Sequence, residues 1–139
     1  MLLSFKSLDL RANMSLPKEM KAIVFHTKGD QAVKTISLPP LRPNYLLIKV
    51  ECVALNPTDW KHVTHGQGAS PFSIVGCDYA GTVVSIGSEV KKSFKRGDKI
   101  YGCAHGGNFN QPYDGVFAEY AMVRECFSQG FIRYLVLTR

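Results

Sequence analysis

Short stretches in which apolar and polar residues alternate make up most of the chain. The clearest is YLLIKVECVAL at 45–55, where Ile48, Val50 and Cys52 fall on one face and Lys49 on the other. A period of two predicts a β-strand that is buried on one side. Further strands are predicted by MKAIVFH at 20–26, VKTIS at 33–37, YAGTVVSIGSEV at 79–90, DKIYGC at 98–103 and VFAEYAMV at 116–123.

Helical patterning is confined to one place. Residues 57–65 begin with Pro57, which is suited to the first helical turn, and precede Gly66, which is suited to a helix end. Many short strands with glycine and proline turns, and no alternation of strands with helices, predict a mainly β chain. We expect a β-barrel or sandwich with one or two short helices.

Composition fits one globular domain, because the 139 residues are 45% hydrophobic and 20% charged. No apolar run approaches the roughly 18–20 residues of a membrane span, and the N-terminus lacks the apolar core of a secretion signal. We therefore expect a cytoplasmic protein without membrane contact. Residues 1–17 are predicted to be a disordered leader, with a mitochondrial presequence as the alternative.

The distribution of charge and the spacing of the cysteines argue against a nucleic-acid-binding protein and against a structural zinc site. The net charge is +6, but the basic residues are scattered apart from KKSFKRGDK at 91–99, which has the pattern of a solvated loop, so nucleic-acid binding is not predicted. Four cysteines lie about 25 residues apart without a CxxC pair, a spacing that does not supply structural zinc. The glycine-containing string GQGASP at 66–71 is no dinucleotide fingerprint, since a proline replaces its third glycine.

Four ordered motifs carry a family resemblance. They are VALNPTDWKHVTHG at 53–66, VGCDYAGTVVSIGSEV at 75–90, RGDKIYG at 96–102 and DGVFAEYAMV at 114–123. Over residues 18–125 the chain resembles the N-terminal catalytic domain of the medium-chain dehydrogenase/reductase superfamily. It looks most like the zinc-free enoyl and quinone reductases, particularly the fungal trans-acting enoyl reductases that work beside polyketide synthases. The resemblance implies a GroES-like β-barrel.

The resemblance also implies that no metal is bound. Zinc alcohol dehydrogenases of the superfamily carry a ligand Cys in a Cys-x-Thr-Asp motif and a ligand His in Gly-His-Glu. The matching residues here are Asn56 to Asp59 and Gly76-Cys77-Asp78. Because a neutral amide replaces the thiolate, Cys77 alone cannot complete a zinc site.

Individual roles follow from the same resemblance. Asn56 is expected near the nicotinamide and the substrate carbonyl, where its amide would donate to a developing enolate oxygen; its alternative role is to stabilise the turn. Lys61 is expected to meet a phosphate or the thioester, or to be a solvated helix residue. Pro57 and Thr58 complete the expected cofactor-binding residues. Tyr79 is a candidate proton donor, with a place in the core as the alternative.

After residue 125 the likeness ends, and residues 126–139 are expected to be a tail outside the family without the Rossmann domain that should follow. The predicted function is NADPH-dependent, zinc-independent reduction of an activated C=C bond in an enoyl thioester or quinone-like substrate. It is predicted to occur only together with a Rossmann domain. The resemblance allows a polyketide synthase and a second copy as partners. The alternatives are a non-enzymatic binding module and a truncated splice product.

Overall fold

The computed structural model describes residues 15–66 and 71–130. Most of the predicted leader, the end of the tail and most of the stretch at 66–71 lie outside these residues. The chain is mainly β, with one α-helix among the described residues, which confirms the predicted fold class. Its elements are β1 (Glu19–Thr27), β2 (Asp30–Ser37), β3 (Tyr45–Ala54), α1 (Pro57–His65), β4 (Ser73–Ile74), β5 (Asp78–Ile86), β6 (Lys99–Cys103), β7 (Tyr120–Arg124), the 3-10 turn η1 (Glu125–Phe127) and β8 (Ser128–Gly130).

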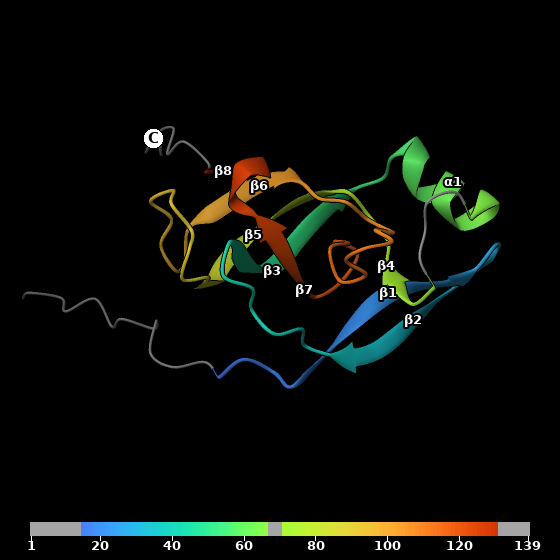
Figure 1. Cartoon of the computed structure of the whole chain (residues 1–139), viewed down its shortest axis with the longest axis horizontal. Helices are drawn as coiled ribbons and strands as arrows, with labels where there is room; N and C mark the ends of the chain where they lie inside the picture. Colours follow the sequence, from blue (N-terminus) through green and yellow to red (C-terminus); the bar gives the residue numbers. More distant parts are fainter. Residues whose placement is uncertain (1–14, 67–70, 131–139) are drawn as a thin grey trace, which may run out of the picture.

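The strands form two antiparallel sheets, ordered β2-β1-β4 and β7-β3-β5-β6-β8, which lie against each other in Figure 1. The segment 117–119 joins the sheets through main-chain hydrogen bonds. The Ile23 N–H donates to the Phe117 carbonyl at 2.8 Å, and the Val50 N–H donates to the Glu119 carbonyl at 3.0 Å. Because β8 pairs with β6, the larger sheet continues beyond residue 125.

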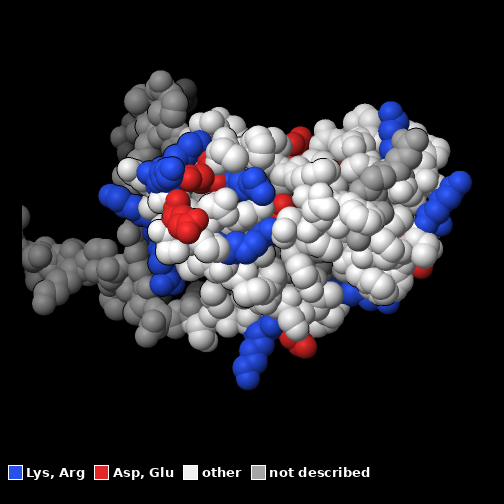
Figure 2. Space-filling view, viewed as in Figure 1, with Lys and Arg blue, Asp and Glu red and all other residues white. Residues whose placement is uncertain are grey.

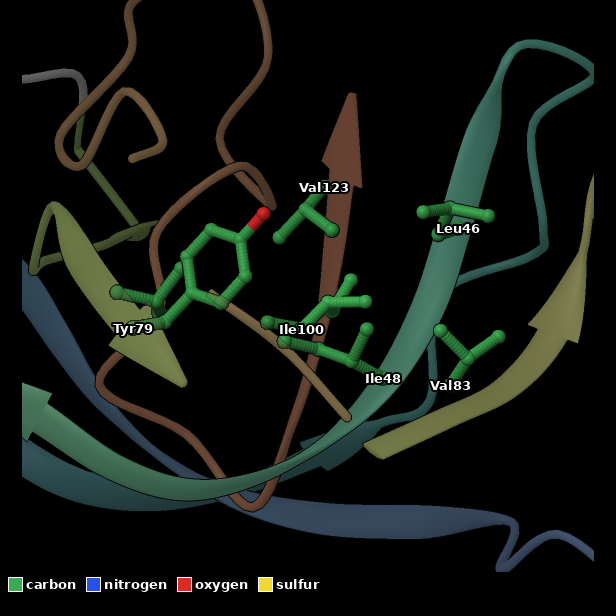
Figure 3. Close-up of a cluster of buried hydrophobic side chains, with 8 residues drawn as sticks. Leu46, Ile48, Tyr79, Val83, Ile100 and Val123 are labelled. Carbon is green, nitrogen blue, oxygen red and sulfur yellow. The ribbon is translucent and has the colours of Figure 1, made fainter. Parts of the chain in front are cut away.

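The main core fills the concave side of the larger sheet. Leu46 and Ile48 of β3 are fully buried there and meet side chains from β5, β6 and β7 (Figure 3). Each such side chain contributes about 1.5–3 kcal/mol when it leaves water. The buried members of this cluster are Leu46, Ile48, Tyr79, Val83, Ile100, Val116, Ala121 and Val123.

The alternation predicted along β3 is correct in its middle and wrong at both ends. Tyr45 and Leu47 are buried too, because the opposite face of this half packs in a second cluster with Met122. Register shifts between Leu47 and Ile48 and between Val50 and Cys52 interrupt the pairing with β5. A bulge adds a residue to one strand and changes which side chains face the core. Cys52, expected on the buried face, is exposed.

Basic side chains on the face shown in Figure 2 lie among acidic and uncharged ones. Lys99 forms an ion pair with Glu51. The Glu125 carboxylate accepts hydrogen bonds from the backbone N–H groups of Lys91 and Lys92 at 2.7 and 2.8 Å. This face therefore offers no continuous basic surface. Within the described ranges, no helix is long and apolar enough to cross a bilayer.

Tyr79 is a buried anchor of the core. Ser128 Oγ donates to the Arg124 carbonyl at 2.7 Å, so the Tyr79 hydroxyl is the donor in its 2.7 Å hydrogen bond to Ser128 Oγ. Burial raises the pKa of Tyr79 to about 12, and a hydrogen bond from the Ser128 hydroxyl to the ionised phenolate would oppose the rise. The folded state therefore favours the neutral phenol.

We expect the free energy of unfolding to fall as the pH rises from 10, the ordinary pKa of tyrosine, toward 12, because only the unfolded chain ionises Tyr79 in that window. Tyr79→Phe removes this pH dependence and costs about 1–2 kcal/mol at neutral pH. Urea unfolding of both proteins at several pH values measures the difference. Parallel curves for the two proteins at alkaline pH would contradict the buried phenol.

Candidate functional site

The mouth of β3 leads directly into α1. Asn56 has an extended backbone, with φ −118° and ψ 153°, and precedes Pro57 in the first turn. The Asn56 N–H donates to Asp59 Oδ2 at 2.7 Å, so Asp59 caps the helix start. The helix ends at Gly66, which has φ 67° and donates its N–H to the His62 carbonyl at 2.9 Å. The helix predicted at 57–65 is confirmed.

Four polar side chains meet at this helix start. The polar cluster consists of Asn56, Asp59, Cys77 and Asp78. Asn56 Nδ2 donates to Asp78 Oδ2 at 3.0 Å. The contact follows from the sheet, because Ala54 and Asp78 are register partners in the pairing of β3 with β5. Asn56, Cys77 and Asp78 are half-buried, so part of each residue reaches the surface.

The turn before β5 places Cys77 in the polar cluster. Gly76 has φ 96°, and a Cβ at this position would lie 2.1 Å from Phe117 Cδ1, so only glycine fits. Burial raises the pKa of the Cys77 thiol. Asp59 and Asp78 raise it further, whereas a hydrogen bond from the Gly106 backbone opposes the rise. The thiol is therefore protonated at neutral pH.

Asp59 is the most deeply buried member of the polar cluster, with 5% of its surface exposed. Its Oδ2 atom accepts from Asn56, but its Oδ1 atom has no hydrogen-bond partner among the described residues. On the neighbouring face of α1, Thr58 Oγ1 lies 3.4 Å from His62 Nε2, one turn further along the helix. Within the same described part of the chain, no group of three His, Cys, Asp or Glu side chains is arranged to hold a metal ion.

The structure gathers some of the predicted site residues and separates others. Asn56 lies in the polar cluster and Thr58 is half-buried beside it. Pro57 is exposed, and the exposed Lys61 places its ammonium 5.8 Å from the centre of the Trp60 ring. The Tyr79 hydroxyl instead faces the core and bonds Ser128. The roles given to these residues stay predictions.

A second polar network was missed by the sequence argument. Asp114 is buried and forms an ion pair with Arg42. Its Oδ2 atom also accepts from the Tyr45 hydroxyl at 3.2 Å, and that hydroxyl accepts from Arg124 Nε at 2.8 Å. The network borders a pocket of about 230 Å³ that His105 also lines. Asp114 lies 72 positions from Arg42 and 69 from Tyr45, so no local sequence pattern links them.

An apolar groove runs beside the far half of β3. It measures about 350 Å³ and is lined by Ile23, Val50, Val53, Leu55 and Phe117, with three further residues, Glu51, Cys52 and Ala118. Leu55 is 84% exposed. Strand β7 pairs with β3 only from Tyr45 to Lys49, so the second half of β3, beside the groove, has no pairing with β7.

Comparison with known proteins identifies what this arrangement is similar to. The sequence model of a protein family, the alcohol dehydrogenase GroES-like domain, matches residues 42–129 of this chain. The chain is 46% identical over 106 residues to the trans-enoyl reductase resD of Aspergillus sclerotiorum, a match that covers 76% of this chain and 29% of that protein.

Solved structures have the same fold. The quinone oxidoreductase of Coxiella burnetii superposes with a TM-score of 0.68 at 30% identity, over 85% of this chain and 38% of that one. A structure from Sinorhizobium meliloti 1021, assigned to the zinc-binding dehydrogenases and bound to NADP, gives a TM-score of 0.74 at 25% identity, over 86% and 40% of the two chains. The chain thus spans roughly a third of the length of the proteins it matches.

The raised pKa of Cys77 predicts slow alkylation. We expect iodoacetamide at pH 8 to modify Cys77 more slowly than the exposed Cys52, Cys103 and Cys126, because the thiolate is the reactive form. Peptide mapping by mass spectrometry measures the four rates. In Asp78→Asn the rate at Cys77 should rise, because one nearby negative charge is lost. Equal rates at all four cysteines in the native chain would contradict the prediction.

Proposed function

Because the chain belongs to the alcohol dehydrogenase GroES-like domain family of the medium-chain dehydrogenase/reductase superfamily, we propose that it forms the catalytic-domain part of a reductase acting on activated C=C bonds. The substrate would be an enoyl thioester or a quinone-like molecule. The observation that carries the proposal is the polar cluster, where Asn56 stands at the mouth of β3 and is held there by Asp78.

NADPH is the proposed cofactor, and the solved dehydrogenase with bound NADP supports this choice. When bound, NADPH supplies a hydride, which would pass to the β-carbon of the C=C bond while water protonates the α-carbon. Asn56, Pro57 and Thr58 would line the nicotinamide side, and the exposed Lys61 would meet a phosphate or the thioester. Since the chain covers 29% of a matched reductase, we propose activity for a form that also carries a nucleotide-binding domain.

The donor set of this site does not suit zinc. Zinc requires thiolate, neutral imidazole or carboxylate ligands gathered in a tetrahedron. Among the described residues, no three His, Cys, Asp or Glu side chains are gathered in this way, although the polar cluster contains Cys77 and two carboxylates. We therefore propose a zinc-independent reaction in which this chain orients the cofactor and substrate.

The expected roles of three residues become narrower in this proposal. The Asn56 amide points its nitrogen at a carboxylate, so we assign it to cofactor positioning. Of the two partners proposed for Lys61 we favour the thioester, whose developing enolate oxygen its ammonium would meet. For Tyr79 we propose the core role that the sequence also allowed. Its hydroxyl bonds Ser128 at 2.7 Å and has a pKa of about 12, which makes it a poor proton donor.

We expect Asn56→Ala and Lys61→Ala to lower kcat/KM by roughly 10-fold to 100-fold in a form that carries the nucleotide-binding domain. Steady-state assays with NADPH and an enoyl thioester measure the effect. The matched control is Lys28→Ala, which removes an exposed lysine from the turn between β1 and β2 and should leave the kinetics unchanged. Unchanged kinetics in Asn56→Ala and Lys61→Ala would remove both residues from the mechanism.

A second function is favoured by the apolar groove beside β3. A non-enzymatic binding module would use this surface, and the exposed Leu55 side chain, to contact a second copy of the chain or a synthase partner. Under this alternative the chain alone is functional and no cofactor is required.

Self-association tests the alternative directly. If it holds, light scattering after size exclusion should show a concentration-dependent dimer, and Leu55→Lys should abolish that dimer by placing a charge in the groove. Phe109→Lys alters a similarly exposed side chain that does not line the groove and should leave the dimer intact. A monomer at every concentration would count against self-association.

A further inference from the structure

The second polar network borders a cavity that the proposed reaction does not use. We call it the Tyr45 pocket, a cavity of about 230 Å³ to which Tyr45, Asn108 and Arg124 contribute. No residue of the polar cluster lines it, although Ala104 in its wall donates its N–H to the Cys77 carbonyl at 2.8 Å. A cavity of this size is smaller than those that take drug-sized ligands, so its occupant would be small.

The charged groups around the Tyr45 pocket leave one positive charge over. Arg42 and Arg124 contribute two positive charges, and Asp114 contributes one negative charge. The guanidinium carbons of Arg42 and Arg124 lie 3.5 and 5.3 Å from the centre of the Tyr45 ring. Arg42 is already paired with Asp114, whereas Arg124 forms no ion pair with any described residue. The surplus charge therefore belongs to Arg124.

Neighbouring charges do not remove this surplus. Glu125 follows Arg124 in the chain, but its carboxylate accepts from the backbone N–H groups of Lys91 and Lys92 at 2.7 and 2.8 Å. The Lys92 ammonium in turn donates to the Ser128 carbonyl at 3.1 Å. This carboxylate and this ammonium are opposite in sign, and neither residue lines the Tyr45 pocket. The positive charge of Arg124 therefore remains for a ligand.

The hydrogen-bonding groups that the Tyr45 pocket leaves over are donors. Arg124 Nε donates to the Tyr45 hydroxyl at 2.8 Å, which leaves the two terminal NH₂ groups of the guanidinium over. The Asn108 oxygen accepts from two backbone N–H groups of its own loop, at 2.9 and 3.2 Å. Its amide nitrogen therefore points away from them and reaches Asp114 Oδ2 at only 3.5 Å. Two parallel N–H groups of a guanidinium match the two oxygens of a carboxylate.

Apolar side chains complete the wall of the Tyr45 pocket. Phe127 lies three residues after Arg124, at the end of the 3-10 turn η1, and its side chain is half-exposed. Met122 of β7 is buried and lines the same cavity. Phenyl rings and thioethers both make favourable contacts with aromatic rings. The pocket thus combines one unpaired cation with surface that suits a flat ring.

We propose that the Tyr45 pocket binds a small carboxylate attached to a flat apolar ring, of the class of an aromatic monocarboxylic acid. The carboxylate accepts hydrogen bonds from the terminal N–H groups of Arg124 and from the Asn108 amide, and the ring packs against Phe127 and Met122. A neutral amide of the same shape is bound less well. This site is additional to the proposed reductase and does not rest on that function.

Four probes test the proposal on the full 139-residue chain. Benzoate has the carboxylate and the ring, benzamide has the ring without the charge, acetate has the carboxylate without the ring, and inorganic phosphate is an anion of another shape. We expect benzoate to cause saturable NMR shifts at the backbone N–H groups of Ala104 and Asn108. Its affinity should be about fivefold higher than that of benzamide, and higher than those of acetate and phosphate. Added salt should weaken benzoate binding.

Variants separate the cation from the ring-binding wall. Arg124→Gln should lower the affinity for benzoate to that for benzamide, and Arg124→Lys, which keeps the charge but loses the planar fork, should have an intermediate effect. Phe127→Ala should weaken benzoate binding and leave acetate binding unchanged. The matched control is Arg96→Gln, which removes an exposed arginine outside the pocket and should change nothing. The dispersion of the NMR spectrum shows whether each variant is folded.

The proposal would be overturned by any of three results. The first is the absence of a saturable shift with benzoate. The second is an affinity for benzamide or phosphate that equals the affinity for benzoate. The third is unchanged benzoate binding in folded Arg124→Gln or, if that variant does not fold, benzoate binding in Arg124→Lys that equals that of the unmodified chain.

Discussion

The pairing of β3 with β5 is the constraint on which the rest of the structure depends. This pairing buries Leu46 and Ile48 in the main core and, at its other end, sets Ala54 beside Asp78. The Asn56 side chain can reach Asp78 only because the two strands end in register. One antiparallel ladder therefore stabilises the domain and also assembles the polar cluster, so an error of register would damage both together.

Local chemistry made much of this architecture predictable from the sequence. Period-two patterns located the strands, and Pro57 and Gly66 fixed the bounds of α1. The capping role of Asp59 was also predictable, since it involves residues three apart. Cys52 was misplaced because a bulge is a property of two strands, and one strand's pattern does not reveal it.

Long-range contacts were the part that the sequence could not provide. Asp114 and Arg42 are separated by 72 positions, and Tyr79 and Ser128 by 49, so no periodicity connects either pair. The hydrogen bond from Asn56 to Asp78 falls in the same class. It changed the chemistry expected of Asn56, because an amide whose nitrogen is already engaged by a carboxylate presents a different set of atoms to a ligand.

The segment 117–119, which joins the two sheets, is held mainly by main-chain hydrogen bonds. Most of its hydrogen bonds run between main-chain groups at Ile23, Val50, Phe117 and Glu119, and such bonds do not depend on which side chains are present. The exception is the Glu119 carboxylate, which accepts from the Lys21 N–H at 2.8 Å. Substitutions at Ala118 can therefore change the wall of the neighbouring groove while these hydrogen bonds remain. A scaffold with this property can acquire new binding preferences through single mutations while its topology stays the same.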